Sequence, residues 1–163
     1  MISMPTTQFI RRMANELSRE LCGGRTSVLV VDDDEGCVQA FKAIFHQPSL
    51  AGCDVEFADS VNQGMALVAS RCFDFAILDY KLPDGTAGDL VRQWRDHGYE
   101  LPFVVITGHG ANEERKEMQA LGALAFMEKC EDMNSTAVNR LLYSSLNTYW
   151  RSRSQSHGAA AYA

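Results

Sequence analysis

The sequence predicts a doubly wound α/β domain on a five-stranded parallel sheet, with the flavodoxin-like strand order 2-1-3-4-5 and an extra N-terminal helix. Short apolar runs rich in β-branched residues alternate five times with segments of helical periodicity between residues 27 and 150. These runs are almost continuously apolar, which is typical of strands that helices cover on both faces. Ligands of such folds bind beyond the carboxyl ends of the strands, so we expect the functional residues on the loops that follow them.

The N-terminal segment, residues 6–21, places apolar side chains at three- and four-residue spacing and predicts a short amphipathic helix. Cys22-Gly23-Gly24 ends this pattern, because glycine is favoured where helices stop. We therefore expect the helix and a linker over residues 1–25, the α/β domain over residues 26–150, and a disordered tail over residues 151–163. The added helix is expected to pack on the domain, to form a dimer or to dock to a partner.

Within the domain, the pattern predicts strands at residues 27–31, 54–58, 75–78, 103–106 and 125–128. It predicts helices at residues 35–45, 61–70, 87–96, 112–121 and 136–150. The last of these helices carries Leu146, Tyr149 and Trp150 near its end. An apolar end of that size predicts a covered surface, under the N-terminal helix or under a second subunit in a homodimer.

The composition excludes several classes of protein. A net charge of −6 and a pI near 5.1 argue against a nucleic-acid-binding face, which needs clustered Lys and Arg. No segment approaches the roughly 18 apolar residues of a membrane span, and the N-terminus lacks the apolar run of a signal peptide. The five cysteines form no CxxC pair, which is typical of buried, reduced thiols. We expect a cytoplasmic protein with no nucleic-acid partner and no membrane span.

Polar side chains follow four of the predicted strands. Asp32 and Asp33 come after the first strand, Asp79 after the third, Thr107 after the fourth and Lys129 after the fifth. In a parallel sheet these positions meet at one edge. Clustered carboxylates repel one another and favour a hard cation such as Mg²⁺. An aspartate beside that cation can form an acyl phosphate, which predicts Asp79 as the phosphoacceptor, with Thr107 and Lys129 binding phosphate oxygens.

Each of these residues also has an ordinary structural interpretation. Asp34 is better placed to cap the next helix than to bind metal, and we leave it out of the site. Asp32 and Asp33 alone are compatible with solvated loop acids, Thr107 with an ordinary turn and Lys129 with a surface charge. The combination of these residue types at the ends of these strands favours the site.

Taken together, these residues resemble the receiver domain of bacterial two-component response regulators, over about residues 26–150. The resemblance implies a magnesium site, a phosphoacceptor, a pair of switch residues and two positions that tune the lifetime of the phosphoryl group. The implied metal ligands are Asp32, Asp33, Asp79 and the main-chain carbonyl of Lys81; the implied switch residues are Thr107 and Phe126; Lys129 is the phosphate-binding lysine; and the Lys81 side chain and His109 are the tuning positions.

The resemblance also implies partners. The phosphoryl donor is a sensor histidine kinase or a histidine phosphotransfer protein, and the output is contact with a downstream protein or passage of the phosphoryl group along a relay. Such a domain is not an enzyme, except that it catalyses its own phosphorylation and dephosphorylation. With only a short helix and a tail beside the domain, the chain looks like a stand-alone receiver.

Two other functions stay open. A receiver-like adaptor that works without phosphorylation has the same fold. A nucleotide-binding α/β enzyme would use Gly108-His109-Gly110 as a phosphate cradle, but the chain lacks a GxGxxG after the first strand and a Walker lysine.

Two positions depart from the receiver pattern. Cys130 stands where the family usually has a proline, often after a cis bond, and a non-proline cis bond costs about 3 kcal/mol. We therefore expect a rearranged loop after the fifth strand. Ala87 stands at the expected glycine position, with Gly88 one residue later, which leaves the start of the third helix of the domain undetermined.

Overall fold

The computed structural model describes residues 25–108 and 112–129, together with Arg140 and Ser144. Its main sheet has five parallel strands in the order β2-β1-β3-β6-β7, which is the predicted order 2-1-3-4-5 when these strands are counted along the chain. All five match the predicted ranges to within one residue at each end. The strands are β1 (Thr26–Val31), β2 (Cys53–Ala58), β3 (Phe75–Asp79), β6 (Phe103–Thr107) and β7 (Phe126–Glu128).

Four helices connect these strands, and a short 3-10 turn, η1 (Pro48–Leu50), precedes β2. The helices are α2 (Glu35–Phe45), α3 (Val61–Ser70), α4 (Ala87–Asp96) and α5 (Asn112–Ala120), of which the first three have the predicted bounds. The helix predicted at residues 6–21 and the tail predicted at residues 151–163 lie outside the described residues. The helix predicted at residues 136–150 also lies outside them, except for Arg140 and Ser144. None of the helices in the described part of the chain has the length and apolar character needed to cross a membrane.

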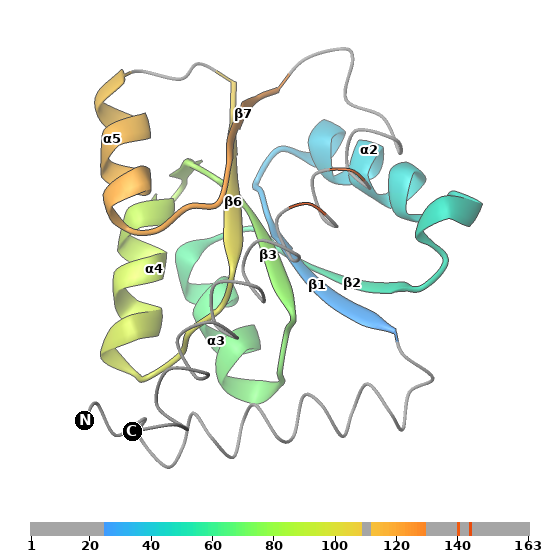
Figure 1. Cartoon of the computed structure of the whole chain (residues 1–163), viewed down its shortest axis with the longest axis horizontal. Coiled ribbons are helices and arrows are strands. Elements are labelled where there is room, and N and C mark those ends of the chain that lie inside the picture. Colours follow the sequence, from blue (N-terminus) through green and yellow to red (C-terminus); the bar gives the residue numbers. More distant parts are fainter. Residues whose placement is uncertain (1–24, 109–111, 130–139, 141–143, 145–163) are drawn as a thin grey trace, which may run out of the picture.

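The helices cover both faces of the sheet, as predicted (Figure 1). Alternate residues of β1 face opposite sides. Val28 and Val30 lie in the core beneath α2, next to Phe41, whereas Leu29 and Val31 lie in the core beneath α3 and α4. All four of these β1 side chains are fully buried. Polar groups of this strand are therefore found at its ends and not along its middle.

Side chains from the preceding loops fix where the helices begin. The Cys37 amide donates to Asp34 Oδ1 at 2.8 Å, so Asp34 caps α2 as predicted. Ser60 Oγ accepts from the Gln63 amide at the start of α3.

Three of the cysteines lie in the described part of the chain, and all carry free thiols: Cys37, Cys53 and Cys72. The prediction that they are buried was wrong, since each is only half-buried. Cys37 lies in the first turn of a helix, Cys53 on an edge strand and Cys72 in a loop.

A small antiparallel hairpin, which the sequence pattern did not predict, lies between β3 and α4. It pairs β4 (Lys81–Leu82) with β5 (Gly85–Thr86). At its turn the Asp84 carboxylate accepts hydrogen bonds from the amides of Val61 (2.7 Å) and Asn62 (3.0 Å), the first residues of α3. These two hydrogen bonds lower the pKa of Asp84, which places a negative charge at a helix N-terminus. The hairpin thus joins the end of β3 to α3.

A capping box sets the start of α4, which the displaced glycine had put in question. Asp89 donates its amide to Thr86 Oγ1 at 3.2 Å, and its carboxylate accepts from the Thr86 amide at 2.9 Å. These reciprocal bonds satisfy two amides that the helix itself leaves unpaired. As a result α4 begins at Ala87 although the expected glycine is displaced.

We expect Thr86→Ala to lower the free energy of unfolding by about 1 kcal/mol, because alanine has no hydroxyl to accept the hydrogen bond from the Asp89 amide. Urea unfolding followed by circular dichroism measures this. Ser70→Ala serves as the control, since it removes a hydroxyl that donates to the Leu67 carbonyl at the other end of a helix. Equal losses in the two variants would contradict a specific role for the cap.

Candidate functional site

The predicted polar residues converge at the carboxyl edge of the sheet. Asp32 follows β1, Asp79 ends β3, Thr107 ends β6 and Lys129 follows β7. Adjacent strands hold these positions in register: Asp79 pairs with Ile106 across β3 and β6, and the Lys129 amide donates to the Thr107 carbonyl at 2.7 Å. The predicted meeting of these residues at one edge is therefore found in the structure.

Three carboxylates form the acidic part of this site. Asp32, Asp33 and Asp79 each present an oxygen, and these oxygens lie within 4.8 Å of one another. Asp32 is 2% exposed and Asp79 9%, whereas Asp33 is exposed to solvent. The Asp34 amide donates to Asp32 Oδ1 at 2.9 Å and so orients that carboxylate. Clustered oxygen donors that solvent can reach fit a hard divalent cation.

Lys129 bridges two of these acids. Its Nζ lies 2.8 Å from Asp32 Oδ2 and 3.0 Å from Asp79 Oδ2, and its side chain is 18% exposed. Burial opposes the positive charge, but the hydrogen bonds to Asp32 and Asp79 outweigh burial and raise the pKa of Lys129. The ammonium therefore stays charged and offsets part of the negative charge at the strand ends.

The Asp79 carboxylate remains in an unfavourable environment despite this pairing. Burial raises the pKa of Asp79, and the charges of Asp32 and Asp33 add to the increase, while the hydrogen bond from Lys129 opposes it. The net direction is upward. An ionised Asp79 is therefore a group whose charge is only partly compensated, and additional positive charge at the site would stabilise it.

An open cavity of about 640 Å³ gives access to these groups, and its lining includes Asp33, Asp79, Lys81, Thr107 and Lys129. Thr107 lines the cavity and is buried, since it is the last residue of the central strand β6. The Lys81 side chain is exposed, and its Nζ lies 3.9 Å from Glu114 Oε1 on α5. A tetrahedral anion bound in this cavity would meet a carboxylate, a hydroxyl and an ammonium.

Phe126, predicted as a switch residue, does not line this cavity. Phe126 is half-buried in β7, and the Arg115 guanidinium of α5 lies 4.9 Å from the centre of its ring. The roles assigned to Phe126 and to the Lys81 side chain stay predictions. His109 and Cys130 lie outside the described residues, and the expected rearrangement of the loop at Cys130 stays a prediction with them.

The sequence interpretation missed two residues near the site. Cys37, in the first turn of α2, lines the cavity, and burial raises the pKa of its thiol. Tyr80, directly after Asp79, is buried, and its hydroxyl donates to Glu117 Oε2 at 2.5 Å. Its adjacency to Asp79 was the only sequence signal, because the partner lies 37 residues away.

Known proteins resemble this chain in sequence and in fold. The family model for the response regulator receiver domain matches residues 28–138, a range that includes every residue of the predicted site. Among solved structures, the non-phosphorylated HemR receiver domain from Leptospira biflexa superposes with a TM-score of 0.64 at 27% identity. That comparison covers 75% of this chain and 94% of the HemR chain.

Two curated relatives are similar in sequence. The photosynthetic apparatus regulatory protein RegA of Rhodobacter capsulatus is 32% identical over 130 residues, which cover 80% of this chain and 68% of RegA. RegA of Cereibacter sphaeroides is 33% identical over 122 residues, which cover 75% of this chain and 64% of that protein. The chain thus spans about two thirds of the length of these relatives.

We expect Asp79→Asn to raise the urea midpoint of the metal-free protein at pH 7.5, because it removes a charge that its surroundings disfavour. The pKa of Asp79 is higher in the folded than in the unfolded protein, so ionised Asp79 lowers the free energy of unfolding. This loss is absent below the unfolded pKa of about 3.9 and reaches its full size above the folded pKa. The advantage of the variant should accordingly vanish near pH 4. Asp59→Asn, at an exposed position, is the control. A lower midpoint for Asp79→Asn would show that the Lys129 ion pair outweighs burial.

Proposed function

The chain belongs to the response regulator receiver domain family, and from this premise we propose that Asp79 accepts a phosphoryl group and that the domain reports this charge to a partner protein. One observation carries the proposal. Asp79 lies at the end of a central strand, within 4.8 Å of two further carboxylates and hydrogen-bonded to Lys129, in an open cavity. Acids that serve only the fold do not need to be gathered around a single ammonium.

The proposed reaction is a phosphoryl transfer. An Asp79 carboxylate oxygen bonds to phosphorus while the bond from phosphorus to the imidazole nitrogen of the donor breaks, and the leaving imidazole keeps the electron pair. The product is an acyl phosphate on Asp79. Because the carboxylate is already a nucleophile when ionised, the step needs alignment and charge stabilisation and no separate general base.

Lys129 and Thr107 are proposed to bind the transferred group. The Lys129 ammonium contacts both Asp32 and Asp79, and we propose that it donates to a phosphoryl oxygen once Asp79 is phosphorylated. Thr107 lies on the adjacent strand at the base of the same cavity, where its hydroxyl is proposed to donate to a second oxygen. These two donors would stabilise charge that develops on the phosphoryl group.

The donor set fits Mg²⁺. We propose that Asp32, Asp33 and Asp79 hold the ion, with the main-chain carbonyl of Lys81 as a further ligand. When bound, the ion supplies positive charge that offsets the phosphoryl oxygens. Two buried acids and one exposed acid leave room for the water ligands that Mg²⁺ usually keeps.

The proposed donor is a phosphohistidine on a sensor kinase or on a phosphotransfer protein. The proposed output is contact with a downstream protein or a further phosphoryl transfer, in the cytoplasm, by a chain that catalyses only its own phosphorylation and dephosphorylation. Similarity to the receiver domain of HemR, 94% of which is covered, supports the proposal that this domain acts as a receiver. RegA and the acid tolerance regulatory protein ActR of Rhizobium meliloti are regulatory proteins by name, which is compatible with contact with a downstream protein and with a further phosphoryl transfer.

We expect acetyl phosphate with Mg²⁺ to add one phosphoryl group to the wild-type protein, as measured by intact mass spectrometry. Asp79→Asn should abolish the modification, because the amide cannot form the acyl phosphate, and EDTA should reduce it at least tenfold. Asp59→Asn, at an exposed position away from the cavity, should keep it.

Two outcomes would contradict the proposal. Modification that persists in Asp79→Asn would place the acceptor elsewhere. If the wild-type protein stays unmodified and its amide NMR spectrum is also unchanged by beryllofluoride with Mg²⁺, the domain acts as an adaptor that does not depend on phosphorylation.

We expect Mg²⁺ alone to stabilise the fold, by about 2.7 kcal/mol at a concentration one hundred times its Kd. Asp33→Asn should require roughly tenfold more Mg²⁺ for the same rise in melting temperature, because it removes one anionic ligand. Asp34→Asn is a matched control: asparagine caps helices as well as aspartate does, and Asp34 is not one of the clustered acids. Equal effects at both positions would indicate a general charge effect and no defined site.

A further inference from the structure

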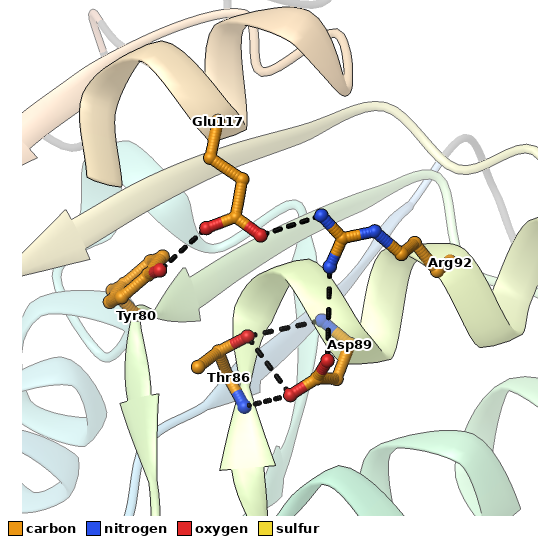
Figure 2. Close-up of polar contacts among 5 residues, drawn as sticks. All are labelled: Tyr80, Thr86, Asp89, Arg92 and Glu117. Carbon is orange, nitrogen blue, oxygen red and sulfur yellow. Dashed lines mark hydrogen bonds and ion pairs between the residues drawn. The ribbon is translucent and has the colours of Figure 1, made fainter. Parts of the chain in front are cut away.

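A chain of polar contacts connects α5 and α4 to the residue that follows Asp79 (Figure 2). Tyr80 Oη donates to Glu117 Oε2 at 2.5 Å, and Arg92 Nη2 donates to Glu117 Oε1 at 2.7 Å. Arg92 Nη1 also lies 3.7 Å from Asp89 Oδ1 in the capping box of α4. Both oxygens of the Glu117 carboxylate are therefore held, one by the residue that follows β3 and one by α4. We call Tyr80, Arg92 and Glu117 the latch.

The protonation states suit these contacts at neutral pH. Burial, together with the Glu117 carboxylate, raises the pKa of Tyr80 to about 12, so its hydroxyl keeps the proton that it donates. The hydrogen bonds from Tyr80 and Arg92 lower the pKa of Glu117, which keeps that carboxylate ionised. Hydrogen bonds to a charged partner are stronger than those between neutral groups.

Gly88 makes the space in which this carboxylate lies. A Cβ atom at residue 88 would lie 2.5 Å from Glu117 Oε1 and 3.1 Å from Arg92 Nη1. Glycine inside a helix costs about 1 kcal/mol relative to alanine, so its presence near the start of α4 calls for a reason. The latch supplies one, and it accounts for the glycine that stands one residue after the expected position.

Polar contacts, more than apolar packing, hold α5 in place. Met118 alone among the nine residues of α5 is buried. A further polar contact is the 3.9 Å approach of Lys81 to Glu114. A helix with so little buried apolar surface can move at modest cost, and α5 begins five residues after Thr107, which lines the cavity.

We propose that the latch holds α5 in the arrangement of the unphosphorylated domain and opens when Asp79 is phosphorylated, so that Tyr80, Arg92 and Glu117 set the energetic coupling between the acceptor site and α5. This inference rests on the proposed function of Asp79. Contacts made only in the unphosphorylated state oppose phosphorylation, and by linkage their removal favours it. Tyr80 is thus a positioning residue that acts through α5.

Two variants open the latch from different elements. Tyr80→Phe removes only the hydroxyl that donates to Glu117, and Gly88→Ala displaces the Glu117 carboxylate with a methyl group from α4. The displaced group is the end of a flexible side chain, and alanine is the better helix former, so the fold should be retained. Neither residue lines the cavity that contains Asp79.

The test is the affinity of the protein for beryllofluoride with Mg²⁺, measured by titration of the amide NMR spectrum. Each variant should bind beryllofluoride about tenfold more tightly than the wild type does. A tenfold change in affinity corresponds to the loss of about one hydrogen bond to a charged group. Without beryllofluoride, the amide signals of α5 in each variant should shift toward their positions in the bound wild type. A contact that served only stability would not move these signals along that line.

Tyr99→Phe is the control for loss of a tyrosine hydroxyl, because the Tyr99 ring stacks on His97 outside the latch, and it should bind as the wild type does. If the wild type binds beryllofluoride and the latch variants bind within twofold of it or more weakly, the latch is overturned and the function of Asp79 stands. If the wild type itself does not bind, the proposed function fails and the latch fails with it.

Discussion

The ammonium of Lys129 is the group on which the rest of the site depends. The sheet brings three carboxylates within 4.8 Å of one another, and burial further disfavours the ionised form of Asp79. Without a positive charge between them, such acids would repel one another or take up protons. Lys129 contacts Asp32 and Asp79 together, so they can be held close without being neutralised. In the proposed reaction, the same arrangement lets the Lys129 ammonium exchange a carboxylate partner for a phosphoryl oxygen.

Parallel pairing explains why these groups meet. The central strands β1, β3 and β6 are covered on both faces, so their interior side chains are apolar and polar residues stand at their ends. Since the strands run in one direction, residues that are 50 positions apart in the chain, Asp79 and Lys129, reach the same edge. The sheet therefore sets the distances within the site, and the strand ends with the residues that follow them supply its polar groups.

Much of this was predictable because it depends on short-range patterns. The β-branched runs defined the five strands to within one residue, and the polar residues after those strands defined the members of the site. The hairpin of β4 and β5 was not predictable, because two-residue strands show no periodicity. The latch was also missed, since the partner of Tyr80 becomes visible only when α5 packs beside α4. Gly88 was noticed as a displaced glycine, but its reason is a carboxylate 29 residues away.

The alternation of side chains along β3 explains how one strand can serve both the site and α5. Successive residues of a strand point to opposite faces. Leu78 and Tyr80 belong to the core beneath α3, α4 and α5, whereas Asp79, between them, faces the acidic cavity. A change at Asp79 that moves the local backbone must therefore move Tyr80, whose carbonyl accepts from the first residue of α4 and whose hydroxyl binds α5. Tyr80, the covalent neighbour of the proposed acceptor, thus connects the cavity to the opposite face of the sheet.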